Sequence, residues 1–228
     1  MCAAIIVICG TVSFASCSSN EDNPSKGLPT VDRITERGKL LVGTTGDYRP
    51  LSYLENDGNY WGFGIEMAEK IAERLNVDIA FVQTSWPTLT ADVLAEPQTF
   101  DLAIGGITIT DARKETMLMS DGYLCNGKTI LCRADEADRF LSLADIDRPE
   151  VRVMVNPGGL NEKFALANLT HAQIIVHQKN EEIPSQVAEG NADVMITESP
   201  RPRGTYRMIS AWPPRCSPLP SPTAKSAC

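Results

Sequence analysis

The 228-residue chain lacks the patterns of several common kinds of protein. It has no Cys-x-x-Cys pair and only two histidines, His171 and His177, so the ligand spacing of a zinc site is missing. Its formal net charge of −8, without any cluster of Lys and Arg, argues against a nucleic-acid-binding surface. Beyond the N-terminal segment, no apolar run is long enough to span a bilayer. We therefore expect a globular protein without metal, cofactor or nucleic-acid partner.

The N-terminal segment has the features of an export signal. Ala3–Ala15 is an apolar stretch of signal-peptide length, although no Lys or Arg precedes it. Phe14-Ala15-Ser16-Cys17 matches a bacterial lipobox, in which the cysteine carries the lipid. We expect a signal peptide with lipobox over residues 1–17, a polar tether over 18–30, and a lipid-anchored protein of the periplasm or cell envelope. The alternative is that this segment forms a buried first strand or helix.

The seven cysteines do not suggest an evident disulfide framework. Five of them lie towards the two ends of the chain: Cys2, Cys9, Cys17, Cys216 and Cys228. The remaining two, Cys125 and Cys132, flank Asn126-Gly127, where a disulfide and a pair of buried thiols fit the sequence equally well.

Between the two ends, apolar strands alternate with amphipathic helices. Lys39–Thr45 and Phe100–Ile104 have the composition of buried strands, and Ile65–Leu75 has apolar residues at helical spacing. The alternation continues to residue 197 and predicts an α/β class with mostly parallel sheets. Gly127–Cys132 is a natural crossover between two lobes. We therefore expect lobe 1 over residues 31–125, lobe 2 over residues 126–198, and a ligand cleft between them.

A glycine turn connects a strand to a helix within Val151–Leu169. Gly158 and Gly159 have no Cβ, so the backbone can approach a ligand closely, and the helix start directs free N–H groups to one point. This arrangement suits a carboxylate or a phosphate. A plain turn between a strand and a helix is the more common explanation of such a pattern.

Five segments together resemble the periplasmic solute-binding proteins of family 3, the amino-acid type. They are TTGDYRPLSY (44–53), TSWPTL (84–89), GGITIT followed by Arg113 (105–113), NGKTILC (126–132) and NPGGLNEKFALANL (156–169). Their combination also resembles the enzymatic branch of that family, the cyclohexadienyl dehydratases, which convert prephenate or arogenate to phenylpyruvate or phenylalanine. The resemblance implies a two-lobed, type II periplasmic-binding-protein-like α/β fold. It leaves one alternative function, an amino-acid receptor that delivers its ligand to an ABC permease.

The resemblance also implies a ligand-binding role for several residues at the ends of strands. Arg113 would form a bidentate pair with a ligand carboxylate, and Trp86 would supply a flat apolar wall for a ring. In a receptor, Glu198 would hold the α-amino group of the ligand. The other expected binding residues are hydroxyl or amide donors to the carboxylate: Thr108, Asn156, Gly158, Gly159 and Asn161.

For the lyase reaction, the resemblance implies catalytic roles for Asp47 and Lys128. Asp47 would contact the ring hydroxyl or orient the catalytic group, and Lys128 would neutralise the carboxylate that leaves as carbon dioxide. The reaction also needs an acid with a raised pKa to protonate the leaving hydroxyl. The family has a glutamate four positions after the threonine that closes the strand ADVMIT, but here that position is Arg201. We therefore expect the chain to be inactive as written.

Residues 199–228 have a different composition from the rest of the chain. They contain no Asp or Glu and nearly half of the 15 prolines. One hypothesis is a frameshift, because codons for Ser199–Tyr206 with one added A can encode Ile-Thr-Glu-Ala-Pro-Trp-Tyr-Val, which puts glutamate at position 201. We expect lobe 2 to lack its last elements and residues 199–228 to have no stable structure. A translated remnant without function is the remaining alternative, and resequencing the gene tests the frameshift.

Overall fold

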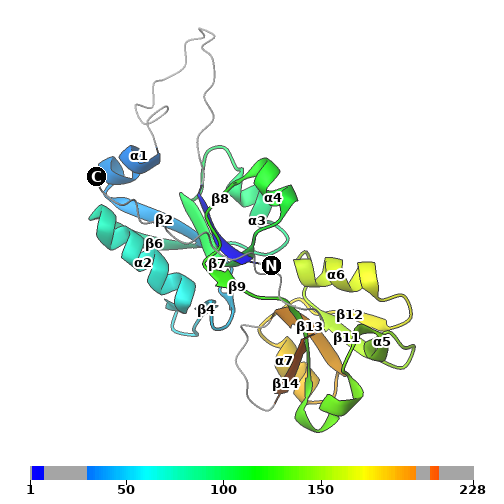
Figure 1. Ribbon diagram of the computed structural model, residues 1–228. Coiled ribbons are helices and arrows are strands. Elements are labelled where there is room, and N and C mark those ends of the chain that lie inside the picture. The colour runs from blue at the N-terminus through cyan, green and yellow to red at the C-terminus, as the bar shows by residue number, and fades with distance from the viewer. Residues whose placement is uncertain (1, 8–29, 199–205, 211–228) are drawn as a thin grey trace, which may run out of the picture.

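The computed structural model describes residues 2–7, 30–198 and 206–210, with side chains for residues 30–198. Two α/β lobes follow one another along the chain, each built on its own sheet (Figure 1). Lobe 1 contains a six-stranded sheet and a small three-stranded sheet, and lobe 2 contains a five-stranded sheet. The two-lobed α/β fold predicted from the sequence is confirmed.

Lobe 1 begins with a strand that lies far in sequence from the rest of its sheet. Its elements are β1 (Cys2–Val7), α1 (Thr30–Arg37), β2 (Lys39–Thr44), β3 (Asp47–Tyr48), β4 (Ser52–Leu54), β5 (Tyr60–Trp61), α2 (Phe63–Leu75), β6 (Asp78–Gln83), α3 (Leu89–Val93), β7 (Leu102–Thr108), α4 (Asp111–Thr116), β8 (Leu118–Met119) and β9 (Leu124–Cys125). The main sheet has the order β6-β2-β7-β1-β8, with β9 also paired to β1. β2 runs parallel to β6 and β7, whereas β1 runs antiparallel to β7, β8 and β9.

The central strand β7 is buried along its whole length because helices cover both faces of the sheet. Its side chains alternate between two cores, as expected for a strand. Leu102 and Ile104 pack with apolar residues of α1 and α2, whereas Ala103 and Ile107 pack with those of α3. This two-sided packing explains why Leu102–Thr108 is an apolar run without polar alternation.

Lobe 2 contains β10 (Lys128–Arg133), the 3₁₀ helix η1 (Ala134–Arg139), α5 (Leu143–Ile146), β11 (Arg152–Val155), α6 (Leu160–Asn168), β12 (Gln173–Val176), α7 (Ile183–Ala188), β13 (Val194–Glu198) and β14 (Tyr206–Ser210). The strand order is β12-β11-β13-β10-β14. β11 runs parallel to β12 and β13, and β10 runs antiparallel to β13 and β14. Val153 and Val155 face the core under α5 and α6, and Met154 faces α7.

The two sheets share one topology. Each has three parallel strands, then one antiparallel strand, then a final strand paired to it. In lobe 2 the antiparallel strand is β10, which opens the lobe, and in lobe 1 it is the N-terminal strand β1. β1 therefore occupies in lobe 1 the place that β10 occupies in lobe 2.

The structure differs from the sequence-based expectation at both ends of the chain. Cys2–Val7, expected within an export signal, form β1, while Cys17 and most of the expected tether lie outside the described residues. Tyr206–Ser210, expected to lack stable structure, pair with β10 as strand β14. The physical reason in both cases is an unpaired strand edge that an apolar or β-branched segment can satisfy. The remaining residues after Glu198 lie outside the described part, including Arg201.

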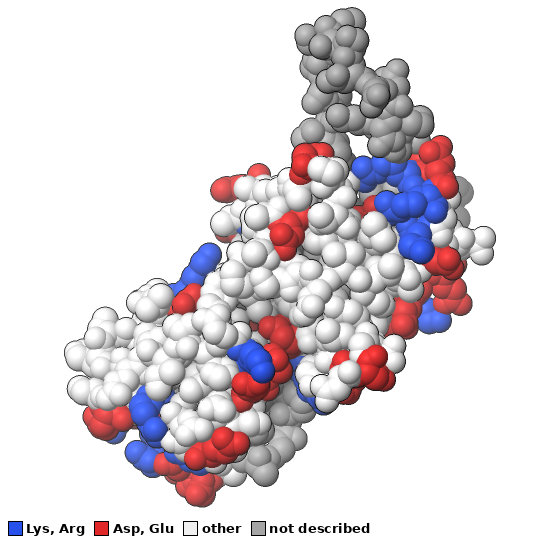
Figure 2. All heavy atoms as spheres, turned by 180° about the vertical axis from the view of Figure 1, so that it is seen from behind, with Lys and Arg blue, Asp and Glu red and all other residues white. Residues whose placement is uncertain are grey.

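Charged side chains on the face opposite that of Figure 1 lie mostly in groups of both signs (Figure 2). Exposed ion pairs such as Lys70–Glu73 and Lys179–Glu182 also join charges of opposite sign on the described part of the chain. Among residues 30–198, no helix has the length and apolar character needed to cross a bilayer.

Candidate functional site

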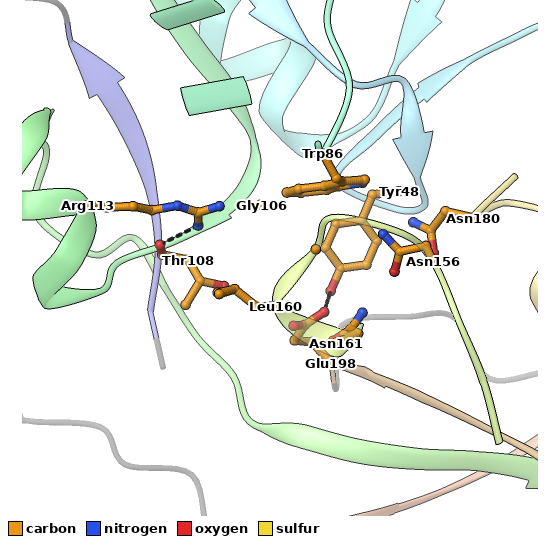
Figure 3. A pocket seen from close by; sticks show the side chains of 11 residues that line it. Tyr48, Trp86, Gly106, Thr108, Arg113, Asn156, Leu160, Asn161, Asn180 and Glu198 are labelled. Atoms are coloured by element: carbon orange, nitrogen blue, oxygen red, sulfur yellow. Dashed lines mark hydrogen bonds between the residues drawn. The ribbon is translucent and has the colours of Figure 1, made fainter. Parts of the chain in front are cut away.

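A pocket of about 340 Å³, open to solvent, lies where the two lobes meet (Figure 3). Lobe 1 contributes Tyr48, Trp86, Gly106, Thr108 and Arg113, and lobe 2 contributes Asn156, Gly159, Leu160, Asn161, Asn180 and Glu198. Most of these residues lie at the carboxyl ends of parallel strands or in the turns that follow them, the usual ligand position in open α/β sheets.

Trp86 forms an apolar wall of the pocket, and contacts with Asp47 and Tyr48 fix the position of its ring. Its indole Nε1–H donates to both carboxylate oxygens of Asp47, at 2.9 and 3.0 Å. The Tyr48 ring meets the Trp86 ring edge to face, with 6.1 Å between centroids. Because the Asp47 carboxylate is occupied by the indole and is not among the lining groups, its observed role is to orient Trp86.

Arg113 is the cation of the lobe 1 wall. Thr110 caps the start of α4 by accepting the Arg113 backbone N–H, and Arg113 Nη1 donates to the Thr108 carbonyl at 2.8 Å. Burial lowers the pKa of the guanidinium, and the nearby Glu198 charge opposes that shift. Among the described residues, no carboxylate forms an ion pair with Arg113, which lines the pocket, so the guanidinium retains N–H donors that can bind a ligand anion.

In the glycine turn of lobe 2, one backbone N–H already donates a hydrogen bond within the protein. Gly158 has φ +70°, and its backbone N–H donates to Glu162 Oε2 at 2.7 Å, so this N–H is not available to a ligand. Gly159 precedes the first residue of α6 and lines the pocket together with Leu160 and Asn161. The helix start therefore reaches the pocket, but through residues 159–161 and not through Gly158.

A buried ion pair lies on the lobe 2 side of the pocket. Lys128 Nζ donates to Glu198 Oε1 and also to Asn161 Oδ1. The side chains of Lys128 and Glu198 are only 3% and 9% exposed. In the β10–β13 pairing the two residues are directly opposite one another, so the sheet register itself brings them together. Lys128 itself does not line the pocket. It affects the pocket through two residues that do, because it neutralises Glu198 and holds the Asn161 side chain.

Three contacts join the lobes around the pocket. The Tyr48 hydroxyl donates to Glu198 Oε2 at 3.0 Å, and Asn180 Nδ2 donates to the Asp47 carbonyl at 3.2 Å. A Cβ added at Gly158 would lie 2.6 Å from Pro87 Cα, so Gly158 and Pro87 are in close backbone contact across the lobes. Sequence reasoning missed Tyr48 and Asn180. Their only signal was their position just after β2 and β12, where parallel strands end.

One polar atom in the pocket has no protein partner among the described residues. Asn156 is 3% exposed and lines the pocket, yet its Oδ1 accepts no hydrogen bond. A buried carbonyl oxygen without a donor is costly, so a ligand hydroxyl or N–H at this point would be favourable. Of the predicted site residues, the pocket wall thus contains Trp86, Thr108, Arg113, Asn156, Gly159, Asn161 and Glu198.

Comparison with known proteins identifies the family. Residues 40–199 match the family model of bacterial extracellular solute-binding proteins, family 3. The chain belongs to this family. The two sequence expectations that rest on the resemblance, the family and its two-lobed fold, are confirmed by this match and by the structural comparison below.

Two curated relatives of this solute-binding protein show where it lies within the family. It is 46% identical to a cyclohexadienyl dehydratase of Pseudomonas aeruginosa over 74% of this chain and 62% of that protein. It is 30% identical to the L-cystine-binding protein TcyJ of Escherichia coli over 54% of this chain and 46% of that protein. The chain therefore spans less than two thirds of the length of either relative.

A solved structure of an amino-acid-binding protein is also similar to this chain. The crystal structure of an ancestral amino-acid-binding protein, AncCDT-1, a precursor of cyclohexadienyl dehydratase, superposes with a TM-score of 0.70 at 38% identity. The similarity covers 75% of each chain. Family 3 proteins are extracellular by description, which supports the coarse location expected from the sequence.

The described residues contain no group of three or more His, Cys, Asp or Glu side chains that could hold a metal ion. Cys125 is exposed at the end of β9, Cys132 is buried in β10, and no disulfide joins them.

Proposed function

We propose that this chain is a cyclohexadienyl dehydratase-like protein that binds prephenate or arogenate in the pocket between its lobes but does not turn it over. The proposal rests on which charged side chains of the pocket already have an ionic partner within the protein. Arg113 has no described carboxylate partner, whereas Glu198 is already neutralised by Lys128. The three side chains together carry one net positive charge, which favours a ligand with excess carboxylate.

The remaining wall suits a ring that carries a hydroxyl. Trp86 and Leu160 offer apolar surface, and the chain is 46% identical to a cyclohexadienyl dehydratase over 74% of its length. The ring hydroxyl would donate to Asn156 Oδ1, which has no partner among the described residues. This assigns to Asn156 the contact that the sequence suggested for Asp47, whose carboxylate is bound to the Trp86 indole.

Binding without turnover follows from the missing acid. Position 201, where the resemblance implies a glutamate, is arginine, and it cannot donate a proton near neutral pH. Glu198 already accepts hydrogen bonds from Lys128 and Tyr48, so its carboxyl group is engaged within the protein and is a poor substitute for that acid.

Calorimetric titration of the full chain with prephenate tests the binding. We expect saturable binding that Arg113→Lys weakens roughly 10- to 100-fold, because lysine cannot form the bidentate pair. Lys114→Ala removes an exposed cation from the same helix and serves as the control, with a change of less than about twofold. Equal affinity in the Arg113→Lys variant would contradict the proposed binding mode. Formation of phenylpyruvate from prephenate by this chain would contradict the proposed lack of turnover.

The second candidate is an amino-acid receptor of an ABC importer. It is favoured by Glu198, a carboxylate on the wall opposite Arg113, and by the amino-acid-binding relatives. A receptor would bind L-cystine, L-arginine or L-glutamine more tightly than prephenate, and Glu198→Gln would abolish that binding. The charge balance described above predicts the reverse order of affinities.

We also propose how the protein is anchored in the cell envelope, on the basis of the lipobox in its sequence. After export, Cys17 would bear the lipid that anchors the protein, and a permease would be the partner of the receptor alternative. Metabolic labelling with a radioactive fatty acid should mark the exported chain and should not mark its Cys17→Ser variant.

A further inference from the structure

The carboxylate of Glu198 is engaged by protein groups through both of its oxygens. Lys128 Nζ donates to Oε1, and the Tyr48 hydroxyl of lobe 1 donates to Oε2 at 3.0 Å (Figure 3). Glu198 is the one acidic side chain among the described residues that line the pocket. A ligand cation would therefore have to compete with Lys128 and Tyr48 for the negative charge of this wall.

The neighbouring amide, Asn161, is engaged in the same way. It lines the pocket, and its Oδ1 accepts a hydrogen bond from Lys128 Nζ. Because a lysine ammonium has no acceptor, the amide oxygen and not the NH2 must face it, which leaves the NH2 as the group that Asn161 can offer to a ligand. Arg113 also offers only N–H donors. The charged side chains and this amide therefore present donors to a ligand.

Such a wall distinguishes two groups that can stand next to a ligand carboxylate. A 2-oxo group is uncharged and accepts hydrogen bonds, whereas an α-ammonium group is charged and needs acceptors. Together with Arg113 and Lys128, an ammonium would be a third positive charge against the single negative charge of Glu198. Burying a charge without an ionic partner is costly. Asn156 Oδ1 cannot supply that partner, because it is a neutral acceptor.

We propose that Tyr48 is a specificity-determining residue that selects 2-oxo acids over 2-amino acids, because its hydroxyl occupies the Glu198 oxygen that an α-ammonium group would use. The inference rests on the proposed function and deepens it. Of the two ligands named there, the pocket prefers prephenate, which has a 2-oxo group, to arogenate, which has an amino group in that place. Tyr48 is 3% exposed and its ring contacts Trp86, so its hydroxyl is held against Glu198.

Calorimetric titration of the full 228-residue chain with prephenate and with arogenate tests this preference. The two ligands differ only in the 2-oxo or 2-amino group, so the ratio of their affinities reports what the wall does to that group. We expect prephenate to bind at least about tenfold more tightly than arogenate, because the ammonium of arogenate has to displace a hydrogen bond to a charged group.

Tyr48→Phe removes the hydroxyl and keeps the ring. In this variant Glu198 Oε2 can accept from a ligand ammonium, so arogenate should gain about tenfold in affinity, whereas prephenate should change less than about threefold. Tyr53→Phe is the matched control, because Tyr53 lies on β4 with Arg49 3.5 Å above its ring and does not line the pocket. It should leave both affinities unchanged. A purely structural role of Tyr48 would weaken both ligands alike and leave their ratio unaltered.

The proposed function and this inference fail in different ways. If neither ligand binds to the parent chain, the proposed function and the inference that rests on it are both wrong. If prephenate binds and arogenate binds equally well or more tightly, the inference alone is wrong. The same holds if the ratio in Tyr48→Phe equals that of the parent. Should Tyr48→Phe lose its cooperative melting transition, the ratio measured on the parent decides.

Discussion

At the scale of single residues, the Lys128–Glu198 pair is the most sensitive feature of the pocket. Both side chains are buried, and each would be an uncompensated charge without the other. Removing one partner of such a pair is strongly destabilising. We expect Lys128→Met to lower the free energy of unfolding by about 3 kcal/mol, measured by urea denaturation at neutral pH.

The double variant distinguishes an unpaired charge from lost packing. Lys128→Met with Glu198→Gln removes the stranded carboxylate charge and should recover a large part of the loss. Lys70→Met, which breaks the exposed Lys70–Glu73 pair, should cause no measurable change. If the double variant is as unstable as the single one, the loss comes from packing and not from charge.

The sequence predicted some site residues well and missed others for a physical reason. Arg113, Trp86 and Asn156 lie in the pocket because each lies within five residues after the end of a strand, which local patterns can indicate. Local patterns do not show the second partner of a side chain. The Asp47 carboxylate looked free in sequence, and only the folded chain shows that the Trp86 indole occupies it.

At the scale of elements, one aspartate organises the connection between α6 and β12. Asp147 Oδ1 accepts the backbone N–H groups of Thr170, His171 and Ala172, at 2.8, 2.7 and 3.1 Å, and Oδ2 lies 3.0 Å from His171 Nδ1. The backbone N–H of His171 is the main reason that the Asp147 pKa is lowered from 3.8.

This lowered pKa predicts a pH-dependent stability. A carboxyl with a lower pKa in the folded state stabilises the protein above pH 3.8, and that contribution is lost as the pH falls below 3.8. We expect Asp147→Asn to lower the melting temperature by a few degrees at neutral pH, with a smaller difference at about pH 3. Glu150→Gln, at an exposed position nearby, should show no such trend. A difference that is constant with pH would contradict this assignment.

Elements with their own apolar pattern could be predicted, and elements defined by pairing could not. The strands Lys39–Thr44 and Arg152–Val155 and the helix Phe63–Leu75 match the predicted segments within two residues at either end. Leu118–Met119 and Leu124–Cys125 have only two residues each and become strands solely by pairing with β1. Short edge strands of this kind have no periodicity to detect.

At the scale of the whole molecule, Gly158 sets how closely the lobes approach. A Cβ at this position would lie 2.6 Å from Pro87 Cα in the other lobe, too close for either backbone. Gly158→Ala should therefore hold the lobes apart, weaken ligand binding at least about tenfold by misplacing the two walls, and raise the radius of gyration in X-ray scattering.

Gly190→Ala is the matched control for this change. Gly190 has φ +81°, similar to the +70° of Gly158, but nothing lies within 4 Å of an added Cβ. Both variants should lose about 1 kcal/mol of stability from the left-handed backbone, and only Gly158→Ala should lose binding. Equal binding in the two variants would show that the Gly158–Pro87 contact does not set the lobe distance.

The place of β1 in lobe 1 also has a consequence during synthesis. β1 leaves the ribosome first, but its partner β7 begins at Leu102, 95 positions after Val7. At about 5–20 residues per second, β1 waits roughly 5–20 s for that partner. β1 therefore has no β7 to pair with during this interval, and the main sheet of lobe 1 can be completed only after residue 108 has been made.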